Sequence, residues 1–539
     1  MKMKRVAAVA GLAGVLLAPT GVTVARASVA TAPAPPSASA IDDYVRDYVG
    51  RTGLPGALVA VTKGDQVVHV AGYGHTAGGA AITKSTPMPL ASVSKSFTAL
   101  AVLRLAGRHK VDLDAPVRTY LPEFTMADPR AAKITVRQLL QQTSGMSDQS
   151  FPELTLPAPG TLKDAVTMLR TAPLATEPGT RMAYHNPNYA VAAQLVEVVA
   201  GVPFGEYLAA AVFRPLGMTS TTTVNTTREL PEEGAGYVRA YGRVIERSHP
   251  KWFLNGSFGV VSTAGDLARW LVAQNGAGHV LPAKTLRTAQ AASGVGGSTY
   301  GMGWYSGATA GGAPQLQHTG WLLTHNSAQT LLPASRYGIA VVTNTGMISG
   351  DDALIITGGL IDLIEGRPGA GAAPFTTTAD PWLAGLTVLN LGLGLLGICR
   401  ARRWARRRVG RAAWRTVVRL VPYVLPVVLF FGLADLMGLL MRRAGTLELI
   451  TYVWLALYVW AATGALAAAG VVGARLVHLV RARGRGEHVR ISKYFESSVS
   501  IYHRGHGRDP YLHGSRPGRR VAGAGEPDAA AAAVLAAGA

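Results

Sequence analysis

The pattern of apolar and polar positions divides the chain into a long mixed region and a strongly apolar C-terminal third. In the mixed region, helical spacing predicts helices over 41–51 and 351–364, and Lys63-Gly64-Asp65 is a hairpin signal. Four short runs have strand-like composition: 57–61, 67–70, 328–332 and 339–342. Strands at both ends of a helix-rich middle predict an α+β domain whose antiparallel sheet uses both termini.

Three apolar stretches follow the mixed region, at 382–399, 417–440 and 449–472. Each is long enough to cross a bilayer as a helix. The pattern therefore predicts a C-terminal transmembrane helical region behind the α+β domain.

The charge distribution predicts how these stretches are oriented. The net charge is +21, and most of the excess follows Cys399 in arginine runs that flank the apolar stretches. Eight arginines crowd the first connection: Arg400, Arg402, Arg403, Arg406, Arg407, Arg408, Arg411 and Arg415. The positive-inside rule places this connection and the C-terminal tail in the cytoplasm, and hence the N-terminal domain outside. Nucleic-acid binding is the weaker interpretation, because the runs lack a recognisable binding motif.

The N-terminus has the pattern of a secretory signal peptide. Lys2, Lys4 and Arg5 precede the apolar run 6–17, and Ala25-Arg26-Ala27 offers a cleavage site. A retained anchor is the alternative, but the apolar run is short for a span. Cys399 is the only cysteine, so no intramolecular disulfide is possible.

Together these patterns predict six segments and a multi-pass protein of the cell membrane. The segments are a signal peptide (1–27), a flexible lead-in (28–40), the α+β domain (41–365), a linker (366–380), three transmembrane helices with an arginine-rich cytoplasmic loop (381–472), and a basic, disordered cytoplasmic tail (473–539).

The first candidate for chemistry is Ser92-Val93-Ser94-Lys95, which opens an apolar helical run. Residues three apart share a helix face, so the Ser92 hydroxyl and the Lys95 amine can meet. A lysine that loses solvation has a lowered pKa and can act as a base toward the serine. A helix cap and a solvated lysine are the alternative. The same spacing recurs at Ser248 and Lys251, where Pro250 argues against a helix.

Two further motifs can add polar groups to such a site. Tyr184-His185-Asn186 can place a phenol and an amide on one loop, for proton transfer and for binding a substrate carbonyl. His318-Thr319-Gly320 precedes the late strands, and Gly320 would let a substrate approach the backbone. The N–H of Trp321 could then join that of Ser92 as an oxyanion hole. Singly, these motifs are also typical of a packed loop and a turn.

The order and spacing of the three motifs resemble the serine β-lactamase-like superfamily, in the branch of class C β-lactamases, DD-carboxypeptidases, D-aminopeptidases and esterases. Other stretches that are similar to this branch are 134–140, 143–146, 215–218, 259–268 and 300–304. The resemblance covers roughly 41–364. It implies a β-lactamase/transpeptidase-like fold, with an antiparallel sheet flanked by helices and a helical subdomain.

The resemblance also implies roles for the motif residues. Ser92 would be the acylated nucleophile, Lys95 its base, and Tyr184 a proton-transfer group. Asn186 would bind the substrate amide. His318 stands where many members have lysine, and Thr319, Gly320 and Trp321 would complete that wall of the cleft and its oxyanion hole.

These roles predict a serine hydrolase that acts on an amide or ester: a D-alanyl peptide, a small ester or a β-lactam. A neutral imidazole at His318 binds a carboxylate less strongly than an ammonium, which favours peptidase or esterase activity over strong β-lactamase activity. The alternative is a penicillin- or peptide-binding sensor with little turnover. We expect no cofactor, no nucleic acid and no identifiable protein partner. The histidines, among them His69, His75, His109 and His325, lack metal-ligand spacing, so no metal is expected.

Overall fold

The computed structural model of the chain describes residues 35–504, apart from 277–280, 347–350, 370 and 442. The predicted signal peptide (1–27), most of the lead-in and the end of the tail lie outside these residues. The chain divides into two compact units, residues 1–397 with 418–472, and residues 398–417 with 473–539.

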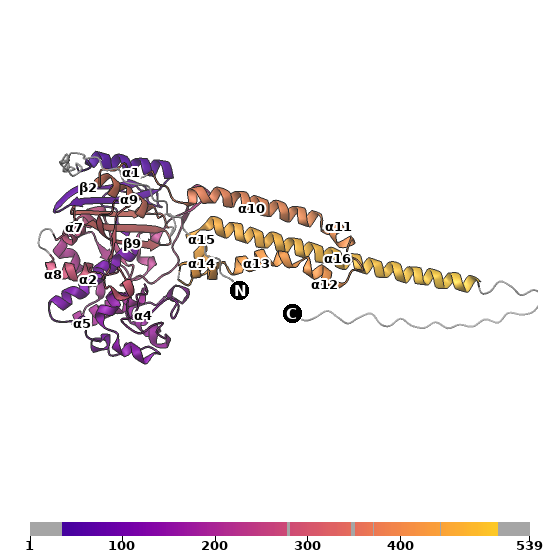
Figure 1. The fold of residues 1–539 in the computed structure, drawn as a ribbon, viewed down its shortest axis with the longest axis horizontal. Coiled ribbons are helices and arrows are strands. Elements are labelled where there is room, and N and C mark those ends of the chain that lie inside the picture. Colours follow the sequence, from indigo (N-terminus) through magenta and orange to yellow (C-terminus); the bar gives the residue numbers. More distant parts are fainter. Residues whose placement is uncertain (1–34, 277–280, 347–350, 370, 442, 505–539) are drawn as a thin grey trace, which may run out of the picture. The chain divides into compact units, whose positions relative to one another are not determined.

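A six-stranded antiparallel sheet forms the centre of the first unit, in the order β2-β1-β11-β10-β9-β8 (Figure 1). Its strands are β1 (Gly56–Lys63), β2 (Gln66–Gly74), β8 (Tyr305–Ala308), β9 (Pro314–Leu322), β10 (His325–Leu332) and β11 (Tyr337–Thr343). Early strand β1 pairs with late strand β11, from Ala57 opposite Thr343 to Lys63 opposite Tyr337. This pairing confirms the prediction that both ends of the domain share one sheet.

Two helices cover one face of the sheet, α1 (Ala38–Thr52) and α9 (Asp352–Ile364) (Figure 1). Apolar side chains at helical spacing, such as Ile41, Val45 and Ile356, pack with alternate residues of β1 and β11. The helix α9 begins at its predicted position because the Asp351 side chain accepts a hydrogen bond from the Leu354 amide, which caps the first turn.

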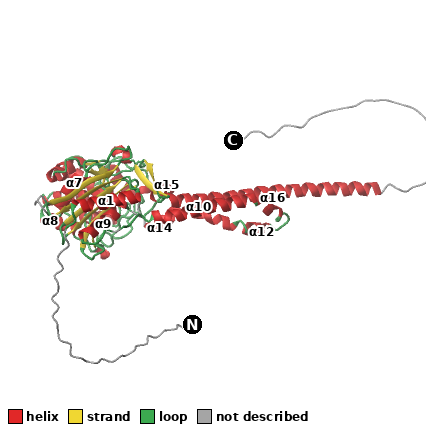
Figure 2. Cartoon of the chain, turned by 90° about the horizontal axis from the view of Figure 1, so that it is seen from above, coloured by secondary structure: helices red, strands yellow, loops and turns green. Residues whose placement is uncertain are grey.

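The other face carries the larger core and the helical subdomain. The Phe97 and Trp270 rings stack there at 3.8 Å between centroids, which joins α2 to α7. The helices of this part are α2 (Ser94–Gly107), α3 (Val136–Leu140), α4 (Leu162–Met168), α5 (Pro187–Ala200), α6 (Phe204–Leu208), α7 (Ala264–Gln274) and α8 (Ala283–Gln290). Two small sheets complete it: β3 (Met88–Pro89), β4 (Thr222–Thr223) and β7 (Val260–Ser262), and the hairpin β5 (Gly236–Ala240) with β6 (Arg243–Arg247). Figure 2 shows the strands of the domain, in yellow, among its helices.

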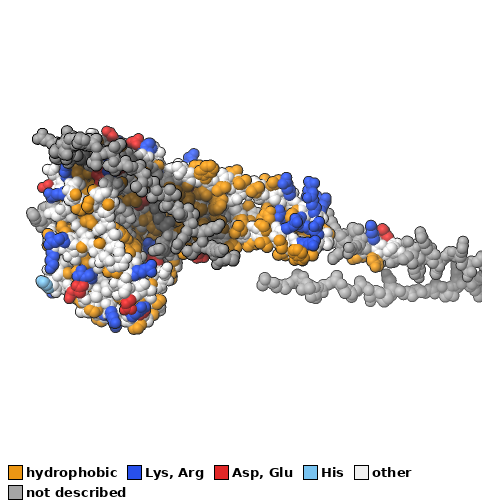
Figure 3. Space-filling view, in the orientation of Figure 1, with side chains coloured by type: hydrophobic (Ala, Val, Ile, Leu, Met, Phe, Trp, Pro, Cys, Tyr) orange, Lys and Arg blue, Asp and Glu red, His pale blue; other side chains and the backbone are white. Residues whose placement is uncertain are grey.

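Among the residues that the structure describes beyond the domain, three helical segments are long and apolar enough to cross a membrane: 376–399, 413–431 and 455–484. The elements concerned are α10 (Thr376–Cys399), α11 (Ala401–Arg406), α12 (Ala413–Val418), α13 (Val424–Phe431), α14 (Leu433–Met441), α15 (Leu447–Val453) and α16 (Leu455–Arg504). Figure 3 shows many exposed hydrophobic side chains along these helices, with Lys and Arg side chains gathered near the far end. Segments α5 and α6 together are also apolar enough, but α5 is buried in the domain core.

Helices α10 and α16 pack closely within the first unit. A Cβ atom at Gly394 would lie 2.7 Å from the Cβ of Ala467, so only glycine allows this approach. The Asn390 side chain donates a hydrogen bond to the carbonyl of Trp460.

The structure differs from several predicted boundaries. The helix α10 begins at Thr376, inside the predicted linker (366–380), and the predicted second stretch (417–440) is divided among α12, α13 and α14. The predicted third stretch begins at 449, but the backbone leaves the helical conformation at Trp454, and the residues before it form the separate helix α15. The helix α16 then continues to Arg504, into the tail that the composition predicts to be disordered. Alanine, leucine and arginine favour helix over 473–483, which explains the continuation.

Candidate active site

The Ser92 and Lys95 side chains meet at the start of α2, as their spacing predicts. A short 3-10 turn, Ala91–Val93, leads into the helix, and the Lys95 Nζ lies 3.1 Å from the Ser92 Oγ. Lys95 is fully buried and Ser92 is 7% exposed. The serine therefore remains open to a small substrate while the lysine is withdrawn from solvent.

The surroundings of Lys95 favour its neutral amine. Burial lowers the pKa of Lys95 well below its usual value, and the positive charge of Arg443 lowers it further, against a smaller opposing effect of Glu153. The Nζ lies 3.2 Å from the carbonyl oxygen of Ser257 and 4.4 Å from the centroid of the Phe258 ring. A neutral amine has a lone pair that can accept the Ser92 proton.

The Tyr184 phenol lies beside this pair. Its ring centroid is 4.9 Å from the Lys95 Nζ, and its hydroxyl interacts with the Ser92 side chain. Burial raises the pKa of Tyr184 above its usual range, so the phenol keeps its proton at neutral pH. Burial thus gives the two groups different character: the Lys95 amine can accept a proton, and the Tyr184 phenol can donate one.

Asn186 follows on the same loop, directly before α5. Its Nδ2 donates a 2.5 Å hydrogen bond to Glu153, and its backbone carbonyl accepts one from the Ser257 hydroxyl. Its Oδ1 is buried and has no hydrogen-bond partner among the described residues. That oxygen is available to accept an N–H from a substrate amide.

His318 precedes the predicted late strands and itself lies within a further strand, β9, which the sequence pattern does not predict. The strand β9 pairs with β10, and its pairing with β8 ends where Tyr305 faces Gln317, so His318 comes just beyond β8. Burial, with a smaller contribution from Lys95, lowers the pKa of His318 to about 3, so the imidazole is neutral. Its Nδ1 lies 2.7 Å from the carbonyl oxygen of Thr319 and therefore carries the hydrogen.

Gly320 is required by the close packing of β9 on the turn that carries Ser92. A Cβ at this position would lie 2.4 Å from the carbonyl oxygen of Leu90 and 3.0 Å from the Cβ of Ala91. Ala91 itself has a φ of 48°, which is strained for a residue with a side chain. The predicted wall of Thr319, Gly320 and Trp321 thus adjoins the nucleophile.

A buried charge cluster adjoins Asn186, and sequence reasoning did not find it. The Arg443 guanidinium lies 3.0 Å from an Asp148 oxygen and 2.8 Å from a Glu153 oxygen, and Asp148 also binds the His185 Nδ1 at 2.9 Å. Burial raises the pKa of Glu153, and the positive charge of Arg443 opposes this rise only in part. For Asp148, burial works in the same direction, but the His185 hydrogen bond and Arg443 outweigh it and lower the pKa.

Asp148, Glu153 and His185 have the donor types of a metal site, with ligand atoms within 4.8 Å of one another. The Arg443 guanidinium already contacts both carboxylates. A protein cation therefore balances this cluster, and we assign no metal to it.

Comparison with known proteins agrees with this geometry. The family model described as Beta-lactamase matches residues 41–354, more than half of the chain. This chain belongs to the beta-lactamase family. Membership makes the region from α1 to α9 a serine hydrolase domain.

Two curated relatives extend the comparison. Protein flp of Staphylococcus aureus (strain N315) is 27% identical over 315 residues, which cover 56% of this chain and 62% of that protein. A D-aminopeptidase of Brucella anthropi is 31% identical over 246 residues, which cover 43% of this chain and 45% of the peptidase. The chain thus spans less than two thirds of the length of either relative.

Solved structures match the fold. An octameric penicillin-binding protein homologue from Pyrococcus abyssi superposes with a TM-score of 0.54 at 22% identity, over 63% of this chain and 79% of its own. A penicillin-binding protein from Bacillus halodurans gives 0.50 at 23% identity, over 60% and 98%. These likenesses establish a β-lactamase/transpeptidase-like fold for the hydrolase domain.

Proposed function

We propose that the chain is a membrane-anchored serine hydrolase that forms an acyl-enzyme on Ser92 outside the cytoplasm. The observation that carries the proposal is the contact of the buried Lys95 amine with the Ser92 hydroxyl at 3.1 Å. The three apolar helical segments and the arginine-rich first connection support the anchoring and its orientation.

The proposed reaction has two halves. Ser92 Oγ attacks the carbonyl carbon of an amide or ester while the neutral Lys95 amine accepts its proton. The resulting oxyanion is held by the N–H groups of Ser92 and Trp321. Tyr184 then protonates the leaving amine or alcohol, and Lys95 can return the proton to the phenol. Water attacks the acyl-enzyme in the second half with the same groups in reverse roles, which releases the acid and restores Ser92.

Substrate candidates follow from the same residues. A D-alanyl peptide, a small ester or a β-lactam offers the carbonyl that Ser92 requires, and Asn186 Oδ1 suits an amide N–H. The neutral His318 favours substrates that need no fixed cation for a carboxylate.

The test uses the full chain in lipid nanodiscs, incubated with a fluorescent penicillin and separately with p-nitrophenyl acetate, beside the Ser92→Ala variant. We expect wild type to react with at least one reagent, and Ser92→Ala to lose labelling or turnover by roughly 10³-fold or more. Persistent penicillin labelling with little turnover would favour a penicillin-binding sensor. A folded wild type that reacts with neither reagent, nor with a fluorophosphonate, would contradict the proposal.

A further inference from the structure

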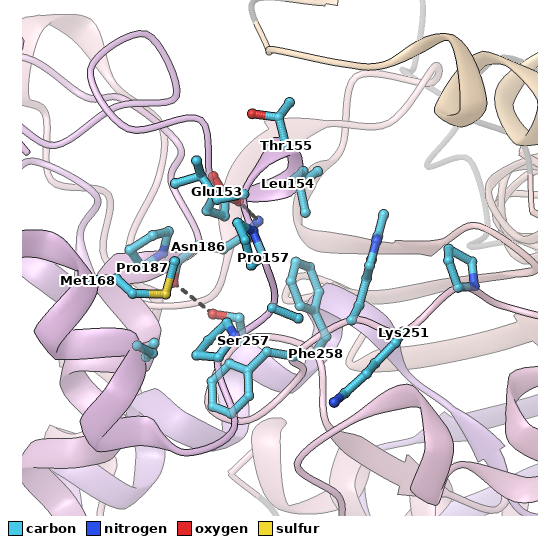
Figure 4. Close-up of a pocket in the computed structure, with 18 of the residues that line it drawn as sticks. Glu153, Leu154, Thr155, Pro157, Met168, Asn186, Pro187, Lys251, Ser257 and Phe258 are labelled. Carbon is cyan, nitrogen blue, oxygen red and sulfur yellow. Dashed lines mark hydrogen bonds between the residues drawn. The ribbon is translucent and has the colours of Figure 1, made fainter. Parts of the chain in front are cut away.

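A cavity of about 380 Å³ adjoins the catalytic residues (Figure 4). Ser257 and Phe258 line the cavity and also contact the Lys95 amine, and Asn186 lines it from the loop that carries Tyr184. Its size falls in the range of small-molecule sites in proteins. The cavity is therefore placed to receive a part of the substrate that extends from the carbonyl at Ser92.

One wall of the cavity comes from outside the hydrolase domain. The 443–453 segment, which joins α14 to the last apolar helix and includes α15, contributes Leu449 and Tyr452 to the lining. The hydrolase side contributes residues of the 151–168 region, such as Ala165 and Met168. The cavity is thus closed between the enzyme domain and a connection of the membrane part.

Specific contacts hold the 443–453 segment on the domain. Arg247 donates a 2.8 Å hydrogen bond to the Thr451 hydroxyl, and its guanidinium lies 3.8 Å from the Tyr452 ring centroid. The Tyr452 hydroxyl donates to the carbonyl of Ser248 at 2.9 Å. All three contacts are made by Arg247 and Ser248 at the end of β6, so they fix the position of the segment beside the cavity.

Arg443 ties the segment to the catalytic loop. It pairs with Glu153, and Glu153 accepts the hydrogen bond of the Asn186 side-chain amide. The guanidinium also pairs with Asp148, so both of these carboxylates share one cation. The connection of the membrane part thereby reaches a residue that faces the substrate.

The lining favours an apolar occupant. Aromatic and aliphatic side chains make up most of it, among them Phe151, Met168 and Phe258. Of its charged residues, Glu153 is paired with Arg443, and Lys251 and Glu448 are exposed to solvent. An alkyl or aromatic group loses water on entering such a site, and each buried methylene adds to binding.

We propose that this cavity binds an apolar acyl group of the substrate, and that the 443–453 segment completes the substrate site. The inference rests on the proposed acyl-enzyme at Ser92 and names its substrate class: esters or amides whose acyl group is a hydrophobic chain of several carbons. The free energy of binding the acyl group in the cavity then lowers the barrier to acylation of Ser92.

The experiment compares p-nitrophenyl acetate, butyrate and hexanoate with the full chain in nanodiscs. We expect kcat/KM to rise by up to about fourfold per methylene, from the burial of each group. Leu449→Trp and Ala165→Phe fill the cavity from its two walls. Each should lower the hexanoate-to-acetate ratio of kcat/KM by roughly tenfold. Val67→Trp, at an exposed position of β2 away from the cavity, should keep the wild-type ratio.

The outcomes separate this inference from the proposed function. Suppose that Ser92 reacts with esters. If the hexanoate-to-acetate ratio of kcat/KM is near one in wild type, or stays at the wild-type value in both filling variants, the cavity does not bind the acyl group. If only Ala165→Phe lowers the ratio, the role of the 443–453 segment is refuted. If no ester and no fluorophosphonate reacts with Ser92 in wild type, the proposed function itself fails. Fluorophosphonate labelling of each variant shows that its site is folded.

Discussion

At the scale of single residues, the site consists of groups that burial keeps neutral beside charges that are paired. Lys95 is buried away from solvent, which lowers its pKa and favours the neutral amine. Burial lowers the pKa of His318 to about 3, so the imidazole is neutral above about pH 3. Arg443 is held between Asp148 and Glu153. A neutral amine next to a serine is suited to accept a proton, while a paired guanidinium acts on its neighbours through its field.

This arrangement predicts the pH dependence of acylation. The groups that face Lys95 are Tyr184, Tyr189, His318, Glu153 and Arg443. Acylation requires the neutral amine, so kcat/KM for p-nitrophenyl acetate should fall as the pH drops through the lowered pKa of Lys95. Arg443→Gln removes a positive charge that disfavours the ammonium. The pKa of Lys95 should rise, and the acid limb should move to higher pH.

Two variants serve as controls for that pH profile. Arg443→Lys retains the charge and should return the acid limb toward its wild-type position. His318→Asn should leave the position of the limb unchanged, because the imidazole does not titrate above about pH 3. A limb that moves in His318→Asn and stays in place in Arg443→Gln would show that Lys95 is not the titrating base.

At the scale of elements, the sequence predicts local features well and tertiary ones poorly. The Ser92 and Lys95 contact follows from helical spacing alone, and the β1–β2 hairpin from its turn residues. The sequence places His318 just before the late strands but does not predict the strand β9 itself, in which His318 lies opposite Gln329 of β10. No local pattern could bring Arg443 to Glu153, since 290 positions separate them.

A second network that joins residues far apart in the sequence is centred on Asp352 and connects α1, α9 and β5. The buried Asp352 of α9 accepts hydrogen bonds from Tyr48 of α1 and from Thr345, and it pairs with Arg239 of β5 at 3.0 Å. Asp352→Asn would leave the buried Arg239 cation without its counter-charge. We expect a loss of about 3–5 kcal/mol in the free energy of unfolding. The measurement is the thermal midpoint of the detergent-solubilised full chain.

The matched control lies on the same helix. Asp362 pairs with Arg367 at 2.5 Å, but the arginine side chain is 36% exposed, so Asp362→Asn should shift the thermal midpoint far less than Asp352→Asn. Equal shifts of the two midpoints would mean that the Asp352 network contributes no more than an ordinary surface pair.

At the scale of the whole molecule, charge and hydropathy predict how the segments outside the hydrolase domain are placed with respect to the membrane. Within the second unit, the guanidinium of Arg475 lies 4.9 Å from the Trp404 ring, so the first connection and the start of the tail contact each other. Both segments are rich in arginine, so by the positive-inside rule we expect both in the cytoplasm. The 443–453 segment would then lie outside, on the side of the hydrolase domain that it contacts.

The single cysteine makes this topology directly measurable. In a Cys399→Ser background, Asp43→Cys places a thiol on the exposed face of α1, and Arg407→Cys places one in the first connection. With a membrane-impermeant maleimide, intact protoplasts should label Asp43→Cys fully, and Arg407→Cys only after the membrane is permeabilised. The Cys399→Ser parent sets the background. Labelling of Arg407→Cys in intact protoplasts would show that the orientation is opposite to the predicted one. It would place the Ser92 site in the cytoplasm, where an exported substrate could not reach it.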